Sequence, residues 1–143
     1  MQQLDIERVK TGIERSWEAG DEIDTDALMD ALEWLDQGFV RVAEKKGGEW
    51  VVNEWLKKAI LLYFRHAGMN EGGWGEYIWV DKIPLKHRVI EQGLRVVPPG
   101  TIRYGSFLEA GCVVMPAYVN IGAWVGAGTM VDTWATVGSC AQI

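Results

Sequence analysis

Two side chains in this sequence, Asp132 and Arg95, have the chemistry to activate and to hold a small polar ligand. Asp132 follows Val131 and precedes Trp134 in the stretch MVDTWATVGSC. We expect a carboxylate between apolar neighbours to be partly shielded from water, which shifts its pKa towards the range of a general base. The structural alternative is an aspartate at a chain corner that accepts a hydrogen bond from its own turn.

Arg95 opens the segment RVVPPG. A guanidinium can hold a substrate carboxylate through two parallel hydrogen bonds. The alternative is an arginine that is solvated or purely structural. Ser139 and Cys140 are possible nucleophiles, but no base lies near them in the sequence, so a packing role is favoured for both.

The stretch 107–142, which contains Asp132, repeats every six residues: FLEAGC, VVMPAY, VNIGAW, VGAGTM, VDTWAT, VGSCAQ. The first position of each unit is bulky and apolar, and the fifth is small. Neither an amphipathic helix nor an alternating strand repeats every six residues, whereas a β-helix does. The repeat therefore predicts stacked coils of short parallel strands, about two coils for six units. The residues expected to point into their interior are Val113, Val119, Val125, Val131 and Val137.

A metal site on such coils needs several histidines that project from the repeats. The two histidines, His66 and His87, both lie outside the repeats, so the sequence predicts no metal site there. The histidine base of many hexapeptide acetyltransferases is absent from the repeats for the same reason.

Composition excludes several classes of partner. The chain has 143 residues with a net charge of −6 and a pI near 4.9, which argues against binding to a nucleic-acid backbone. No apolar run approaches the ~18 residues of a membrane span, and the N-terminus lacks a signal-peptide core. Cys112 and Cys140 have no metal-ligand spacing, which suggests reduced thiols in a cytoplasmic protein.

The first part of the chain is predicted to be α/β and mainly helical. Apolar periodicity predicts helices over 2–18 and from Asp24 or Thr25 to Gly38. A strand over 39–43, a turn at Gly47-Gly48 and a returning strand over 50–52 form a hairpin. A third helix follows Asn53 and is expected to be the most buried helix.

The segment that joins the two parts is expected to contain little regular structure. Glycines at 69–76 predict a flexible loop, residues 77–80 a strand, and residues 85–93 a short helix. We place the boundary near residue 94. The N-terminal domain is then 1–94 and the repeat domain 95–143.

Three stretches together carry a resemblance to a known family. RVAEKKGGEWVVNEWLKKAILL, GLRVVPPGTIRYGSF and MPAYVNIGAWVGAGTMVDTWATVGSCAQI resemble the bacterial 2,3,4,5-tetrahydropyridine-2,6-dicarboxylate N-succinyltransferases. The similarity runs from about residue 39 to the end and is looser over 1–38. It implies a helical domain followed by a left-handed β-helix, assembled as a homotrimer.

The resemblance also implies a reaction. Members transfer succinyl from succinyl-CoA, a co-substrate and not a bound cofactor, to the amino group of the ring-opened dicarboxylate in lysine and diaminopimelate biosynthesis. The substrate-binding arginine of the family corresponds to Arg95, and its aspartate corresponds to Asp132. No metal is implied.

Family members continue beyond AQI with further coils that supply a second acid and most of the CoA groove. We therefore expect the 143-residue chain by itself to be inactive. Two other hypotheses stay open: a non-catalytic module that only forms trimers, and a hexapeptide acyltransferase with a different acceptor.

Overall fold

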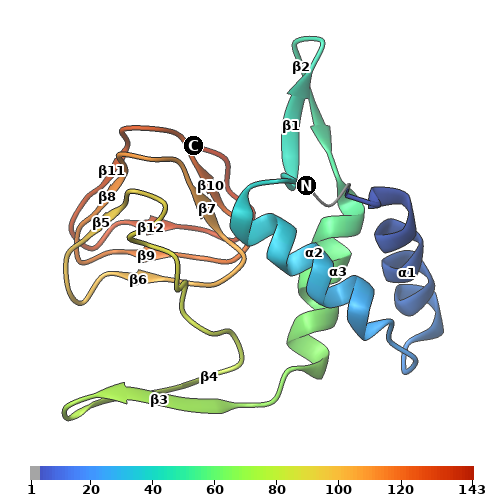
Figure 1. The fold of residues 1–143 in the computed structure, drawn as a ribbon, viewed down its shortest axis with the longest axis horizontal. Coiled ribbons are helices and arrows are strands. Elements are labelled where there is room, and N and C mark those ends of the chain that lie inside the picture. Colours follow the sequence, from blue (N-terminus) through green and yellow to red (C-terminus); the bar gives the residue numbers. More distant parts are fainter. Residues whose placement is uncertain (1–3) are drawn as a thin grey trace.

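A computed structural model describes residues 4–143. Three helices pack together at one end, a stack of short parallel strands forms the other end, and two hairpins project from the body (Figure 1). The helices are α1 (Ile6–Ala19), α2 (Thr25–Gln37) and α3 (Glu54–His66). No helix in the described part of the chain is long and apolar enough to cross a membrane.

The ends of α1 and α2 follow from capping residues in the sequence. The Asp24 carboxylate accepts a hydrogen bond from the Ala27 backbone N–H at 3.0 Å, and Gly38 ends α2 with φ of +75°. The second helix is therefore confirmed with the predicted cap. The first begins at Ile6 and not at residue 2, and residues 2 and 3 lie outside the described residues. The buried core of the bundle consists mainly of Val9, Ile13, Ala27, Leu28, Ala31, Leu32, Leu35, Trp55, Leu56, Ala59, Ile60 and Leu62.

The prediction that the third helix is the most buried is wrong. Seven residues of α2 are buried, against five of α3. The reason is position, because α2 contacts both other helices and also the strand β7 (Phe107–Leu108). Asn53 does precede α3, but its amide donates to the Arg41 carbonyl at 2.7 Å and does not cap the helix.

The first hairpin pairs β1 (Ala43–Lys46) with β2 (Glu49–Val52) around the predicted Gly47-Gly48 turn. The strand expected over 39–43 is wrong except at its last residue. Phe39 and Val40 instead donate their backbone N–H groups to the Trp34 carbonyl and so complete the end of α2.

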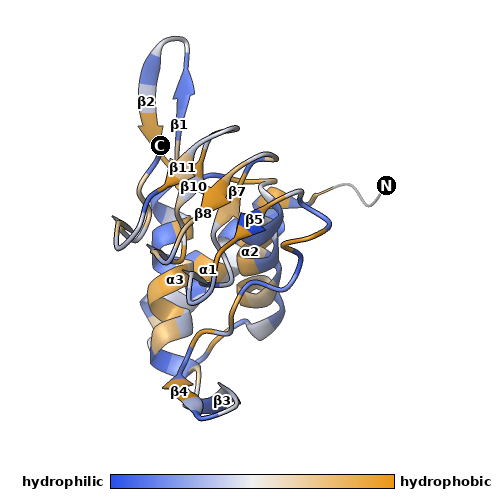
Figure 2. Cartoon of the chain, turned by 90° about the vertical axis from the view of Figure 1, so that its left-hand side faces the viewer, coloured by the Kyte–Doolittle hydropathy of each residue, from blue (hydrophilic) through white to orange (hydrophobic). Residues whose placement is uncertain are grey.

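The second hairpin occupies the segment that was expected to be a flexible loop. Residues 70–74 form the strand β3 (Asn70–Trp74), which pairs with β4 (Tyr77–Asp81) from Asn70↔Asp81 to Trp74↔Tyr77. The strand predicted over 77–80 is confirmed. Figure 2 shows part of β4 in the hydrophobic colour, below the helices.

The helix predicted over 85–93 is absent from the structure. This segment runs extended and then turns, because Leu85 bridges Arg103 and the Lys86 N–H donates to the Ile102 carbonyl at 2.8 Å. Tertiary pairing to the repeat region thus outweighs the local helical pattern.

The repeat region consists of three short parallel sheets, as in the first coils of a β-helix (Figure 1). One sheet has the order β11-β8-β5, the second β12-β9-β6, and the third pairs β10 with β7. The strands not yet placed are β5 (Arg95–Val96), β6 (Thr101–Ile102), β8 (Val113–Val114), β9 (Tyr118–Val119), β10 (Trp124–Val125), β11 (Met130–Val131) and β12 (Thr136–Val137).

One buried residue in each strand from β6 to β12 forms the interior of the coils. Four of the five predicted interior valines are confirmed, but Val113 lies on the outer face and Val114 is fully buried in its place. The register shifts because Val114 and Val119 are five residues apart, whereas the other neighbouring interior positions are six apart. The interior column is Ile102, Leu108, Val114, Val119, Val125, Val131 and Val137.

The same register places Cys112 at a buried position between two coils. It lies two residues before Val114, at the small position of its unit, and is 1% exposed. Its thiol is 3.1 Å from the Gly126 carbonyl oxygen of the next coil. Burial raises the pKa of this thiol.

A buried ion pair joins the helices to the coils. Lys86 donates to the Asp36 carboxylate at 2.8 Å, to the Asp36 carbonyl at 2.7 Å and to the Ser106 carbonyl at 2.8 Å. The Gly105 N–H donates to the same carboxylate at 2.9 Å. The two side chains are 0% and 4% exposed, so α2, the linking segment and the first coil share one polar contact.

Candidate functional site

The corners between the short strands set the geometry around Asp132. Six corners are four-residue turns in which the fourth N–H donates to the first carbonyl at 2.9–3.3 Å. The third residue of each turn has a positive φ. Such a position favours glycine, since a Cβ is disfavoured there. The six residues at this position are Gly105, Gly111, Gly122, Gly128, Trp134 and Cys140.

Asp132 is the first residue of the corner that contains Trp134. Its carbonyl accepts from the Ala135 N–H at 2.9 Å, and its carboxylate accepts from the Thr133 N–H at 2.7 Å. The side chain is exposed, so the partly dry environment expected from the sequence is not present around this single chain. The local hydrogen bond is the one that the structural alternative anticipates, and it leaves the second carboxylate oxygen without a partner in the described chain.

Arg95 lies on the same sheet as the strand that precedes Asp132. It is the first residue of β5 and pairs with Val113, which in turn pairs with Met130. Arg95 and Met130 are thus two strand spacings apart, about 10 Å along the stack, and Asp132 is two residues beyond Met130. Both side chains are exposed, and no carboxylate of residues 4–143 lies within ion-pairing distance of Arg95.

Ser139 and Cys140 are held by contacts within the coils. The Ser139 hydroxyl donates to the Ile121 carbonyl at 3.0 Å, and the Cys140 sulfur lies 3.5 Å from that hydroxyl. Neither contact brings a histidine or carboxylate to these groups. Within the described residues, no group of three or more histidine, cysteine or acidic side chains could hold a metal ion.

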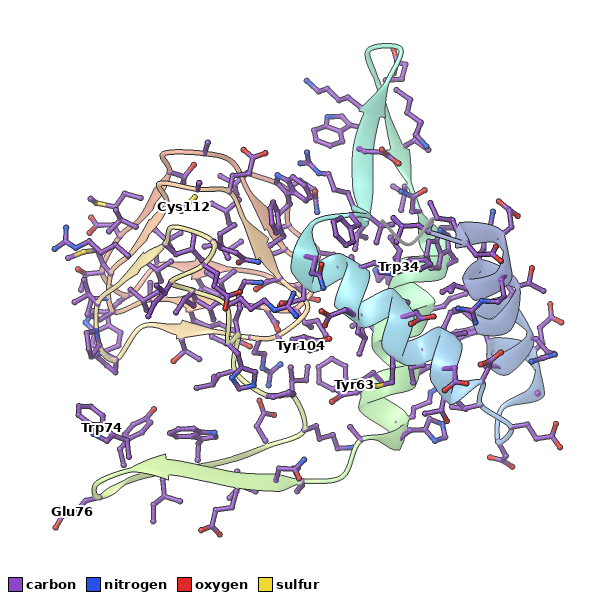
Figure 3. All side chains as sticks on the ribbon, viewed as in Figure 1. Trp34, Tyr63, Trp74, Glu76, Tyr104 and Cys112 are labelled. Atoms are coloured by element: carbon purple, nitrogen blue, oxygen red, sulfur yellow. The ribbon has the colours of Figure 1, made fainter. Side chains whose placement is uncertain are left out.

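An aromatic groove lies between the second hairpin and the coils, and the sequence analysis missed it. The groove has a volume of about 590 Å³. Figure 3 shows Trp74 directed from the hairpin towards the coils and Glu76 directed away from them. The available signal was the aromatic spacing on either side of Gly75-Glu76, which a two-residue turn places on one face. The aromatic residues that line the groove are Trp74, Tyr77, Trp79 and Tyr118.

One of the residues that line the groove is a paired arginine, Arg103. Arg103 donates to one oxygen of the Asp81 carboxylate through Nε at 3.1 Å and through a terminal nitrogen at 2.7 Å. Its other terminal nitrogen donates to the Asn120 side chain at 3.2 Å. These bonds fix Arg103 as a structural tie between the hairpin and the coils, whereas Arg95 has no ion-pair partner among residues 4–143.

A second, smaller hollow adjoins the corner of Asp132. Its volume is about 290 Å³, and its lining includes Tyr77 of the hairpin and Trp134 of the corner. Pro99, Thr101 and Tyr118 complete much of its wall and also line the larger groove. The two hollows therefore form one continuous surface that reaches from the hairpin to the corner.

Comparison with known proteins points to one family. Residues 8–66 match a sequence profile described as tetrahydrodipicolinate N-succinyltransferase N-terminal. The chain is 49% identical over 152 aligned positions to the 2,3,4,5-tetrahydropyridine-2,6-dicarboxylate N-succinyltransferase of Idiomarina loihiensis, covering 96% of the chain. It is 46% identical to the protein of that name from Methylorubrum extorquens, with all of the chain aligned, and 52% identical over 82% of the chain to the protein from Sodalis glossinidius.

The aligned parts of these three relatives are 56%, 55% and 45% of their length. The chain thus spans about half the length of the curated relatives that it matches. The matched half includes both Arg95 and Asp132.

Proposed function

Because the chain is related to the N-terminal half of the tetrahydrodipicolinate N-succinyltransferases, we propose that the protein carrying it transfers succinyl from succinyl-CoA to the amino group of ring-opened tetrahydrodipicolinate. The observation that carries this proposal is the sequence identity of 46–49% over nearly the whole chain, including the two candidate residues. The reaction belongs to lysine and diaminopimelate biosynthesis.

Arg95 and Asp132 have complementary roles in this reaction. The acceptor carries two carboxylates, and the exposed, unpaired guanidinium of Arg95 binds one of them. The free oxygen of the Asp132 carboxylate accepts a hydrogen bond from the acceptor amine. Arg95 lies about 10 Å by the strand repeat from Met130 on one sheet, and Asp132 follows two residues after Met130, so an extended seven-carbon molecule touches both side chains.

The chemical step needs only an acid–base partner. The neutral amine nitrogen forms a bond to the thioester carbonyl carbon, and the carbon–sulfur bond then breaks to release the thiolate of CoA. The proton lost by nitrogen passes to Asp132 and then to the departing sulfur or to solvent, which balances the reaction without a metal or redox group.

The assembly and setting of the protein are part of the same proposal. The coils wind left-handed and associate as a homotrimer in the cytoplasm, so that Asp132, exposed in a single chain, lies at a boundary between subunits. The domain boundary falls near residue 94, between the turn that ends at Gly93 and the strand β5.

Release of CoA, measured with a thiol reagent, tests the proposal in the full-length protein. We expect Asp132→Asn to lower kcat by about 100-fold or more, the range for loss of a general base, with little change in KM. Arg95→Ala should instead raise the KM for the acceptor by about tenfold or more, as for loss of a charged hydrogen bond.

Two controls separate these roles from damage to the fold. Arg103→Ala removes an arginine of the same region that is already paired, and should lower the melting temperature while the KM for the acceptor changes little. Wild-type kinetics in both Asp132→Asn and Arg95→Ala would refute the assignment. Absence of succinyl transfer by the wild-type protein would refute the function itself.

A further inference from the structure

Trp134 occupies a backbone position at which four of the six corner turns have glycine. Of the six corner turns, four have glycine at the third residue, and the two exceptions are Trp134 with φ of +62° and Cys140 with φ of +63°. A bulky residue with this backbone conformation is strained, and strained residues that persist in a fold are concentrated at functional positions.

The two exceptions differ in what their side chains do. Cys140 is half-buried, packs against the hydrophobic core of the helices, and places its sulfur against Gly122 of the coil below. Packing thus explains a side chain at that corner. The Trp134 side chain is 77% exposed and contributes little to either core. Packing within this chain therefore does not account for the tryptophan.

The backbone holds Trp134 firmly in this exposed position. Its N–H donates to the Pro116 carbonyl of the coil below at 2.7 Å, and the turn is closed by the bond between Asp132 and Ala135. The indole is therefore presented two residues from Asp132 by a fixed turn. It lines the 290 Å³ hollow together with Tyr77 of the hairpin.

We propose that Trp134 is a positioning residue for the acceptor, and that its indole covers the methylene chain of an amino-dicarboxylate whose amine lies at Asp132. This inference rests on the proposed function. The acceptor carries its polar groups near both ends of the seven-carbon chain and methylenes in the middle, and a flat apolar ring two residues from Asp132 covers those methylenes. The hollow beside Trp134 is near the lower end of the ~300–1,000 Å³ of small-molecule sites, which suits so small a molecule.

The test is Trp134→Gly, because the proposal predicts opposite effects on stability and on activity. Glycine is the residue that this backbone conformation favours, so the melting temperature should stay within about 3 °C of the wild type or rise by that amount. The KM for the acceptor should nevertheless rise about tenfold, as expected when an apolar contact with a substrate is lost. Trp134→Phe, which keeps a flat apolar ring, should restore most of the affinity.

Cys140→Gly is the matched control, because it makes the same backbone change at an equivalent corner. It should leave the KM for the acceptor unchanged. The mass of the assembled particle, measured by light scattering, should be the same for each variant as for the wild type. Succinyl-CoA is saturating in every assay, so a change caused by Trp134→Gly should appear in the KM for the acceptor alone.

Three results would overturn the proposal. One is a wild-type KM in an active Trp134→Gly protein, which would leave the proposed function intact. A second is a fall of the melting temperature by more than about 5 °C, which would assign Trp134 to the fold. The third is a smaller particle mass for Trp134→Gly, which would make the tryptophan an interface residue between copies of the chain. A wild-type protein without succinyl transfer would instead refute the proposed function. The role of Trp134 would then be tested by calorimetry, which compares binding of the dicarboxylate to the wild type and to Trp134→Gly.

Discussion

The helical region, residues 6–66, and the coiled region, residues 95–143, build their cores in different ways. Side chains from three helices mix in the first core, so each helix contributes a broad stripe and each buried residue has neighbours from several elements. In the coiled region, each strand from β6 to β12 contributes one interior side chain, which stacks on the interior side chain of a neighbouring coil. A helix can therefore rotate slightly and keep its core, whereas a one-residue shift in a strand moves the side chain from the interior to the outer face.

The largest expected effect comes from the difference between an interior and an outer-face position of a strand. Val125 is fully buried in the coils, whereas Val113 lies on the outer face although both open a predicted six-residue unit. Val125→Asp places an unpaired charge in a dry core and should cost roughly 3–5 kcal/mol or more, enough to unfold the coils. Val113→Asp should cost less than about 2 kcal/mol, typical of a partly exposed substitution. Circular dichroism and urea unfolding of the two variants measure the contrast, and equal losses would contradict the assigned register.

Much of the coiled region could be predicted because its period is independent of tertiary context. The columns from Val119 onwards are correct, since each strand and corner there takes six residues. The error at Val113 arises where the corner around Pro116 is one residue shorter, and a period alone cannot place a single deletion. Cys112, and not Gly111, consequently occupies the small position of that unit.

Outside the repeats, sequence patterns failed where tertiary contacts decide the structure. Glycines at 72, 73 and 75 predicted a loop. In the structure Gly72 packs against the Trp79 ring, and a Cβ at residue 72 would lie 2.5 Å from an atom of that ring. Close packing against an aromatic ring, and not flexibility, explains that glycine. Similarly, the surroundings of Asp132 depend on what covers its corner, and this cannot be read from its two neighbours in the sequence.

The second prediction concerns the contact that couples the two regions. Lys86→Ala removes the cation from the buried Asp36 carboxylate, and loss of one partner of a buried pair costs about 3–5 kcal/mol. Because the pair joins α2 to the first coil, differential scanning calorimetry should show both regions destabilised together. Lys58→Ala breaks the half-exposed pair with Glu14 inside the helical region, and should cost less than about 1 kcal/mol. A Lys86→Ala protein as stable as Lys58→Ala would show that the regions are not coupled through this pair.

The smallest expected effect is a pH dependence at the same boundary. Tyr104 of the coils donates to the Glu33 carboxylate of α2 at 2.5 Å, and Figure 3 shows its ring between the two regions. Burial acts to raise the pKa of Glu33, but hydrogen bonds from Tyr104 and Gln37 and the charges of Arg88 and Lys86 outweigh it and lower the pKa. A lowered carboxyl pKa stabilises the fold above the unfolded value of about 4.5, and this contribution is lost as the pH falls through the folded value.

Tyr104→Phe should therefore destabilise the protein more at pH 7 than at an acidic pH below the lowered pKa of Glu33, where the carboxyl group is protonated. Urea unfolding at the two pH values measures the difference. An equal loss at both would mean that the hydroxyl contributes nothing to the ionised carboxylate, and that only the packing of the ring joins the regions.

The thiol of Cys112 is a built-in chemical probe of how often the coils open. Alkylating reagents attack the thiolate, and this sulfur is both enclosed between two coils and held in its protonated form by a raised pKa. It can therefore react only while the coil beside it is transiently separated from its neighbour. The rate of labelling at Cys112 therefore reports how often this coil opens. A labelling rate faster than that of global unfolding would show local opening of the coil, and an equal rate would show that the whole chain must unfold first.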